Sequence, residues 1–477
     1  MTSALLAIVL FSAVLARVNP EDRTFVSKVV DKFIDDIKPN FQDKELAELF
    51  ESCYPNTLDT TVYSYTPSST GDEDTFLITG DITAMWLRDS TNQIVPYLRF
   101  ARQDEHLQSM IRGVLNRQVK SVLIDPYANA FNFDRTGHPD SHTDDNTKRP
   151  AALGTRQNAM TPEIFERKFE IDSLAAVLSL SHQYYNATED PTPFNARWVK
   201  AVKLIIDTAR KNQIGSGPYT SYEYSFTRSC NRPTETIMDG EGWPSKFTGL
   251  VPIRSAFRPS DDATKLPYFI PGNVMLLMGL RRCAPILEVV AGAPEVAKEA
   301  LKLAQEIDDA VHRFAILDHP MVGKVFAFEV DGFGSAYFMD DANIPSLLSL
   351  PYLGYVDRND PIYKNTRKFV LSEYNPYFFK GEAGEGIGGP HVGPGYIWPM
   401  SIIMRAYTSD DKEEIKAFLE VLKKSATNGY MHESFHLDNV NSYTRPWFAW
   451  ANSLFGDMLI DLMGRFPELI LHWWRVC

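Results

Sequence analysis

The sequence predicts an all-α fold in which helices are arranged in pairs and the long loops that join them gather at one end. Three observations lead to this prediction. Apolar residues recur at the three- and four-residue spacing of amphipathic helices, few segments alternate as strands do, and the connections are alternately short and long. A toroid of α/α pairs is one arrangement that fits this pattern.

Amphipathic spacing locates the helices along the chain. It marks segments at 25–37, 107–122, 174–180, 198–206, 296–311, 344–350, 415–422 and 450–462, and a further helix can start at residue 86. Pro39 stops the first helix, and Pro294 stands near the start of the helix at 296–311. Thr408 or Ser409 is the expected N-cap of the helix at 415–422, which Gly429 follows.

Long irregular segments separate several of these helices. Residues 125–158 are too long for a plain connector and are expected to form a functional loop, and residues 215–266 form a second long loop region. Residues 381–395 contain seven glycines in fifteen positions, a density that regular structure tolerates poorly. A short strand is expected at 325–330.

The composition fits one large globular domain. The chain has 477 residues, of which 44% are hydrophobic, and no linker divides it, so we predict a single domain over residues 17–477. A formal net charge of −13 without a long basic run argues against nucleic acid as a partner. Aromatic residues make up 12% of the chain, and their flat faces suit sugar rings as well as a core.

The N-terminal segment is typical of a secretory signal peptide. Residues Ala4 to Ala16 form an apolar run that is too short to span a bilayer and ends in small residues. We therefore predict cleavage after Ala16 and a secreted protein without a membrane partner; a buried N-terminal helix is the alternative. Asn186 begins an Asn-Ala-Thr acceptor in an expected polar loop, which predicts a glycoprotein.

Four cysteines, Cys53, Cys230, Cys283 and Cys477, are far apart in the chain. No Cys-x-x-Cys motif is present, so a cysteine zinc site is not indicated. One or two disulfides can form in an oxidising compartment, and the sequence leaves all three pairings open.

Two adjacent carboxylates, Asp261 and Asp262, are the first candidates for catalysis. Hydrolysis of a glycosidic bond needs one carboxyl group as an acid and a second as a base or nucleophile. A neighbouring anion helps to keep the acid protonated, and Glu433, which follows a helix end, can serve as the base. The structural alternatives are a helix start capped by Ser260 and, for Glu433, a solvated loop acid.

Other polar residues stand among aromatic residues and glycines, as in many binding sites. Trp86, Arg88 and Asp89 share a Trp-Leu-Arg-Asp motif, and His391 lies in the glycine-rich loop. Arg88 and Arg258 can hold a carboxylate ionised or bind a sugar hydroxyl. The structural alternatives are core packing for Trp86 and a local salt bridge between Arg88 and Asp89.

The segment 432–436 reads His-Glu-x-x-His, the order found in zinc proteases. In those enzymes both histidines lie on one face of a helix. Here Gly429 precedes the motif and no third ligand follows it, so a zinc protease is the minor alternative. The pairs Asp144–Asp145 and Asp340–Asp341 offer oxygen ligands without EF-hand spacing. We predict that the protein needs no metal and no other cofactor.

Together these motifs resemble glycoside hydrolase family 125, the exo-α-1,6-mannosidases. The resemblance covers most of residues 25–462. The segments that carry it are 79–82, 86–90, 169–173, 257–262, 388–391, 432–435 and 445–452.

The resemblance implies an (α/α)6 barrel that releases terminal α-1,6-linked mannose from glycans with inversion of configuration and without a metal. It implies that the general acid is Asp261 or Asp262 and that the base is Glu433. Loops around Trp86, His391 and Trp447 are then expected to wall a pocket at one end of the barrel. A non-catalytic glycan-binding relative is the alternative, although a lectin does not need all three carboxylates. The sequence does not predict the oligomeric state.

Overall fold

The computed structural model describes residues 17–143, 145–147, 160–213, 224–237 and 252–472. Its framework is helical. The helices are α1 (Lys28–Ile37), α2 (Lys44–Cys53), α3 (Asn56–Thr60), α4 (Leu87–Ile94), α5 (Glu105–Ile124), α6 (Ile171–Thr188), α7 (Ala196–Lys211), α8 (Ile270–Pro285), α9 (Pro294–Phe314), α10 (Pro361–Val370), α11 (Pro399–Tyr407), α12 (Lys412–Ser425), α13 (Ala449–Arg465) and α14 (Pro467–Ile470).

Short antiparallel strands occupy the connections and form sheets of two or three strands. They are β1 (Val62–Thr66), β2 (Asp74–Leu77), β3 (Met85–Trp86), β4 (Ala130–Phe131), β5 (Asn146–Thr147), β6 (Ile164–Glu166), β7 (Phe226–Thr227), β8 (Tyr268–Phe269), β9 (Ile316–His319), β10 (Gly323–Phe326), β11 (Glu329–Val330), β12 (Ala336–Tyr337), β13 (Phe378–Lys380), β14 (Glu385–Ile387), β15 (Tyr396–Ile397), β16 (Ser434–His436) and β17 (Asn439–Thr444). The prediction of helices is thus confirmed for the framework, but the fold is not purely α. Strands of two to six residues are too short for alternation to reveal them.

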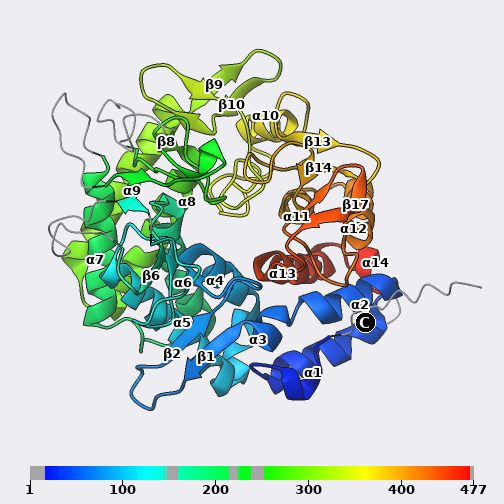
Figure 1. Cartoon of the computed structure of the whole chain (residues 1–477), viewed down its shortest axis with the longest axis horizontal. Coiled ribbons are helices and arrows are strands. Elements are labelled where there is room, and N and C mark those ends of the chain that lie inside the picture. The colour runs from blue at the N-terminus through cyan, green and yellow to red at the C-terminus, as the bar shows by residue number, and fades with distance from the viewer. Residues whose placement is uncertain (1–16, 144, 148–159, 214–223, 238–251, 473–477) are drawn as a thin grey trace, which may run out of the picture.

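The helices form a ring, with α4, α6, α8, α11 and α13 nearer its centre and α5, α7, α9 and α12 outside them (Figure 1). Neighbouring inner helices pack against each other, as α4 does against α6 and α13, and α6 against α8. The outer helix α7 contacts α5 and α9 in the same way. From α4 to α9, and again from α11 to α13, the chain alternates between inner and outer positions.

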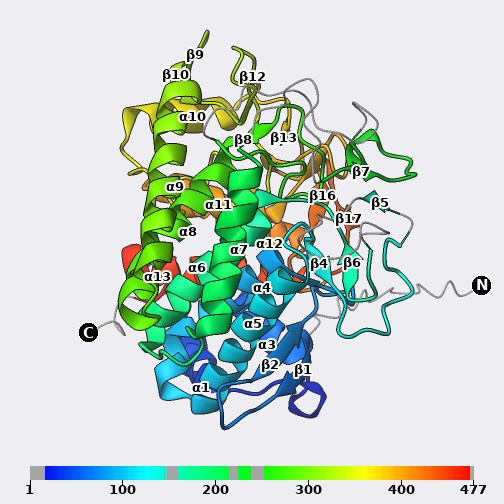
Figure 2. The same ribbon diagram turned by 90° about the vertical axis from the view of Figure 1, so that its left-hand side faces the viewer.

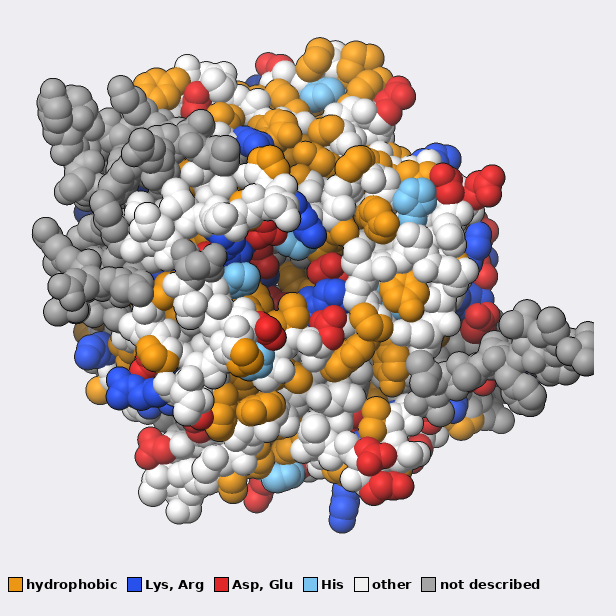
Figure 3. Space-filling view, viewed as in Figure 1, with side chains coloured by type: hydrophobic (Ala, Val, Ile, Leu, Met, Phe, Trp, Pro, Cys, Tyr) orange, Lys and Arg blue, Asp and Glu red, His pale blue; other side chains and the backbone are white. Residues whose placement is uncertain are grey.

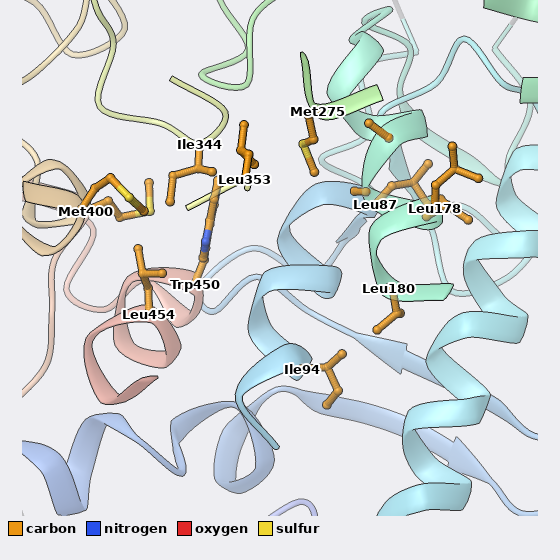
Figure 4. Packing of buried hydrophobic residues seen from close by; sticks show 14 of the residues in the cluster. Leu87, Ile94, Leu178, Leu180, Met275, Ile344, Leu353, Met400, Trp450 and Leu454 are labelled. Atoms are coloured by element: carbon orange, nitrogen blue, oxygen red, sulfur yellow. The ribbon is translucent and has the colours of Figure 1, made fainter. Parts of the chain in front are cut away.

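The distribution of apolar residues explains which helices lie inside. Most positions of α8 and α13 are buried, so these helices are enclosed by protein. The outer helix α9 instead buries one stripe at three- and four-residue spacing, namely Ala297, Ala300, Leu303, Ala304, Ile307, Ala310 and Val311. Figure 4 shows part of the shared core, to which α4, α6, α8, α11 and α13 all contribute side chains.

Two local predictions from the sequence are wrong. Residues 344–350 form turns rather than a helix, because Pro345 and Pro351 interrupt the apolar run and the Asp340 carboxylate accepts the amides of Leu347 and Leu348. The N-cap of α12 is Asp411, not Thr408 or Ser409, because its carboxylate accepts the amides of residues 413 and 414.

The strands and long connections β4–β7, β16 and β17 gather at one end of the helices, on the right in Figure 2. These connections lead from the outer helices α5, α7 and α12 to the inner helices α6, α8 and α13. This agrees with the prediction that the long loops gather at one end.

Several predictions concern features away from this end. Cys53, Cys230 and Cys283 are free thiols, while Cys477 and the expected signal peptide lie outside the described residues. Asn186 is exposed, but it lies on the last turn of α6 rather than in a loop. Within the described ranges, no helix has the length and hydropathy required to cross a membrane.

A glycine of α13 permits close contact with Tyr54, and its replacement tests this packing. A Cβ at Gly456 would lie 2.8 Å from the Cα of Tyr54, whereas a Cβ at Gly464 of the same helix meets nothing within 4 Å. Gly456→Ala should therefore lower the free energy of unfolding by about 1–3 kcal/mol. Gly464→Ala is the matched control and should be neutral or stabilising, since alanine favours a helix by about 1 kcal/mol over glycine. Equal urea midpoints for the two variants would contradict this packing.

Candidate active site

A cavity of about 280 Å³ lies among the converging loops. In Figure 3 the corresponding face has a hollow near its centre, edged by acidic, basic and histidine side chains. The cavity is lined by Thr79, Ile82, Trp86, Arg88, Asp89, Arg232, Pro259, Ser260, Asp261, Asn343, His391, Val392, Trp398, Glu433, Thr444, Arg445, Phe448 and Trp450. Six predicted site residues are thus brought together: Trp86, Arg88, Asp89, Asp261, His391 and Glu433.

A tight turn presents Asp261 to the cavity. Phe257 and Ala263 form an antiparallel bridge, the Asp261 amide donates to the Arg258 carbonyl (2.9 Å), and the Arg258 amide donates to the Asp262 carbonyl (2.8 Å). Asp261 itself has a φ of +66°, the left-handed position that glycine usually fills in such hairpins. Most residues with a Cβ are disfavoured there by about 1–2 kcal/mol, and aspartate is among those that tolerate it best. The turn thereby places the Asp261 side chain in the lining of the cavity.

Asp262 has the opposite environment. Its side chain is fully buried, whereas that of Asp261 is 23% exposed. The Asp262 carboxylate accepts a hydrogen bond from Ser260 and lies 3.5 Å from Nδ1 of His391. Burial raises the pKa of Asp262, but His391 and Arg258 lower it by more than burial raises it. The net pKa therefore lies below its usual value. Asp262 is therefore an ionised partner of His391. No helix begins at Ser260, so this residue is not an N-cap.

His391 is the positively charged member of this pair. Burial lowers its pKa, but Asp262, with smaller contributions from Glu433 and Asp261, raises it to about 9. The Nη1 of Arg232 donates to the His391 carbonyl (2.6 Å) and fixes the glycine-rich loop. The cavity therefore contains an imidazolium at neutral pH.

Glu433 enters the cavity from the segment between α12 and β16. Thr444 Oγ1 donates a hydrogen bond to Glu433 Oε2 (2.9 Å), and Arg445 lies 3.7 Å from Oε1. Asp81 accepts a hydrogen bond from Arg445 Nε (2.7 Å) and so holds this guanidinium. Thr444 and Arg445 therefore hold the carboxyl group of Glu433 in place from two sides.

The guanidinium of Arg88 gathers four carboxyl groups beneath the cavity. It lies 2.6 Å from Glu170, 3.1 Å from Asp172, 3.4 Å from Asp89 and 3.5 Å from Asp261. All four distances are within the range of an ion pair, so one guanidinium is shared among four carboxyl groups. Carboxyl groups crowded around one cation disfavour one another's charged forms.

The pKa values of three carboxyl groups in the cluster are raised. Burial raises the pKa of Glu170 well above its usual value; Arg88 lowers it, while Asp261 and Asp172 raise it further. Burial likewise raises the pKa values of Asp172 and Asp89 to about 6 each, although Arg88 opposes both shifts. Asn129 bridges the cluster, because its amide donates to Glu170 (3.1 Å) and to Asp261 (3.3 Å).

The cavity wall also offers unpaired polar groups. The indole N–H groups of Trp86, Trp398 and Trp450 are buried without a hydrogen-bond partner among the described residues. Oδ2 of Asp89 also lacks a hydrogen bond there, although it lies 3.4 Å from the Arg88 guanidinium. Buried polar groups are usually satisfied, and exceptions often belong to binding sites. Donors and acceptors set among aromatic faces suit a polyhydroxylated ligand such as a sugar.

Two predicted binding residues do not line the cavity. Arg258 is buried, and its Nε donates to Glu329 (2.6 Å) outside the cavity lining. Trp447 packs beside Gly80 and is likewise absent from the lining. The cluster residues Glu170 and Asp172 were missed as site residues, although they stand in a segment that carries the family resemblance.

The His432–His436 segment does not have the geometry of a zinc protease. Residues 434–436 form strand β16 rather than a helix. His432 stacks on Tyr443 with ring centroids 3.7 Å apart, and its Nδ1 lies 3.1 Å from the Arg445 carbonyl. The two histidines therefore do not share a helix face. Of the other suggested oxygen ligands, Asp340 binds backbone amides and Asp144 lies outside the described residues.

Residues 43–460 match the profile of the family described as metal-independent alpha-mannosidase, GH125. The chain belongs to this family. A structure from Streptococcus pneumoniae that belongs to a family of metal-independent alpha mannosidases, described as a non-productive substrate complex with alpha-1,6-mannobiose, is 36% identical, with a TM-score of 0.84. The match covers 92% of this chain and 99% of the relative. GH125 membership and this similarity support a glycoside hydrolase that acts as an α-mannosidase.

Two further similarities add context. The Meiotically up-regulated gene 157 protein of Schizosaccharomyces pombe is 45% identical over 456 residues, covering 94% of this chain and 88% of its own length. Its name describes no activity. A bacterial glucoamylase complexed with acarbose is 13% identical with a TM-score of 0.54, covering 92% of this chain and 60% of its own, and so shares the fold alone. The GH125 chain thus has neighbours of the (α/α)6 glycosidase type.

The ion pair between Asp262 and His391 predicts a pH-dependent signal. Because the folded pKa of His391 is about 9 against an ordinary 6.5, its imidazolium contributes stability that is complete below pH 6.5 and is lost as the pH rises through 9. Asp262→Asn should move the His391 pKa down toward 6.5 in an NMR titration of labelled histidines. His432, whose pKa is lowered by burial, is the internal control and should not respond. A wild-type His391 that titrates near 6.5 would refute the ion pair.

Proposed function

We propose that the protein is an exo-acting α-1,6-mannosidase that releases terminal mannose from glycans with inversion of configuration. The observation that carries this proposal is that Asp261 and Glu433, from distant parts of the sequence, line the same cavity. GH125 membership supports the sugar, and the relative complexed with alpha-1,6-mannobiose supports the linkage.

In this proposal Asp261 is the general acid and Glu433 is the general base. Asp261 gives its proton to the glycosidic oxygen as the bond to the anomeric carbon breaks. Glu433 takes a proton from water, whose oxygen forms the new bond on the opposite face of the sugar. The two carboxyl groups of an inverting enzyme are expected to lie ~6.5–9.5 Å apart to leave room for that water.

Asp261 is preferred to Asp262 as the acid for physical reasons. Asp261 faces the cavity near Glu170, whose pKa burial raises well above its usual value, whereas Asp262 is fully buried against an imidazolium. A group held ionised by His391 is poorly suited to donate a proton. Asp262 instead fixes the charge and orientation of His391, which can donate a hydrogen bond to the sugar.

The size of the cavity supports exo action. Its volume of about 280 Å³ falls just below the ~300–1,000 Å³ typical of drug-sized ligands and suits one terminal sugar. We assign contacts with the hydroxyl groups of this sugar to Asp89, Arg88 and the indole of Trp86. Their charged and N–H groups lie in the wall and provide both donors and acceptors.

We also propose that the ring is a complete (α/α)6 barrel within a single domain over residues 17–477. The alternation of inner and outer helices supports this, with the turns at 344–354 in place of the inner helix between α9 and α10. The apolar run at 4–16 supports a secretory signal peptide, and thus a secreted protein.

Substitution of the two proposed proton-transfer groups tests the assignment. Asp261→Asn and Glu433→Gln should each lower kcat for α-1,6-mannobiose about 10²–10⁴-fold, measured as release of free mannose. On α-mannosyl fluoride the two should diverge, because fluoride leaves without protonation. Asp261→Asn should recover most of its activity, whereas Glu433→Gln should not.

Asp262→Asn is the matched control for the acid. It removes a neighbouring carboxylate without removing the proposed proton donor, so its losses on the two substrates should be equal. If Asp262→Asn shows the fluoride rescue and Asp261→Asn does not, the two roles are reversed. A wild-type protein that binds mannose but releases none from the disaccharide would instead be a glycan-binding relative.

A further inference from the structure

Lys168 is a buried cation behind the turn that carries Asp261. It lies between β6 and α6, and only 1% of its side chain is exposed. Its Nζ donates a hydrogen bond of 2.7 Å to the backbone carbonyl of Asp261. Lys168 does not line the cavity, so it touches the proposed acid through the backbone alone.

The bonded carbonyl belongs to the residue with the unusual backbone. Asp261 has a φ of +66°, and a residue with a Cβ persists in that conformation only where its surroundings enforce it. Rotation of this residue toward an ordinary β conformation would reorient its carbonyl and its carboxyl group together. A fixed donor on the carbonyl therefore also fixes the direction of the carboxyl group.

The ammonium group is itself held from several sides. Glu235 accepts its hydrogen bond at 2.9 Å, and Glu166 lies 3.6 Å away. Arg228 binds the same two carboxylates at 3.2 and 2.7 Å, so it anchors both. Burial lowers the pKa of Lys168, but Glu166, Asp261 and Glu235 raise it above its usual value. Lys168 is therefore a charged and rigid donor.

We propose that Lys168 is a positioning residue for general-acid catalysis, which holds the left-handed backbone of Asp261 so that its carboxyl group faces the glycosidic oxygen. This inference rests on the proposed role of Asp261 as the acid. It assigns no contact between Lys168 and the sugar. Loss of the ammonium group should therefore impair proton donation and leave substrate binding nearly intact.

The test compares Lys168→Met with wild type on α-1,6-mannobiose and α-mannosyl fluoride. Misplacement of the acid should lower kcat for the disaccharide about 10–10²-fold, with KM changed less than about threefold. The fluoride needs no acid, so its kcat should fall less than about threefold. Lys423→Met is the matched control. Lys423 is also largely buried and is paired with Asp43, but it lies on α12 away from the cavity. Its replacement should not change the ratio of the rates on the two substrates.

The outcomes separate this inference from the proposed function. If Asp261→Asn shows the fluoride rescue and Lys168→Met slows both substrates equally, Lys168 has only a structural role and the inference is wrong. If Asp261→Asn shows no rescue, the assignment of the acid fails first. Should Lys168→Met not fold, Glu235→Gln is the second variant, because it weakens the hold on the ammonium group and keeps the lysine. It should give a smaller loss of kcat, confined to the disaccharide. Equal losses of kcat on both substrates would overturn the inference.

Discussion

The buried guanidinium of Arg88 connects the helical ring to the cavity. Arg88 lies in the first turn of α4, Glu170 and Asp172 lie at the start of α6, and Asp261 lies on the hairpin that leads toward α8. Removal of one partner from a buried ion pair leaves an uncompensated charge and typically costs about 3–5 kcal/mol. The cluster therefore fixes the inner helices relative to each other, and the same burial raises the pKa of Glu170 beside the proposed acid.

The two neighbouring aspartates show how environment divides roles between like residues. A left-handed backbone turns Asp261 toward the cavity, while the next side chain, Asp262, is buried against His391. Both side chains are chemically equivalent, so the difference comes from the turn and from the groups around it. The hairpin bridge and the Lys168 hydrogen bond offset the strain at Asp261. These interactions therefore stabilise the backbone conformation that the site requires.

The sequence predicted the helical framework well, because amphipathic spacing directly reflects which face is buried. It did not distinguish Asp261 from Asp262, since backbone dihedral angles at a turn depend on partners such as Lys168, 93 residues away. It missed the roles of Glu170 and Asp172, because these depend on Arg88, which is distant in the sequence and close only in the fold. Arg258 appeared equivalent to Arg88 in sequence, but the carboxylate that it binds belongs to Glu329 outside the cavity lining, a pairing that only the tertiary fold reveals.

The stereochemistry of the first-formed sugar tests the central claim most directly, namely that Asp261 and Glu433 act as acid and base on a water molecule. The measurement is a proton NMR time course of α-1,6-mannobiose hydrolysis, recorded before the released mannose mutarotates. Direct attack by water from the face opposite the leaving group predicts that β-mannose appears first. Initial release of α-mannose would indicate a covalent intermediate and would contradict the roles assigned to these two carboxyl groups.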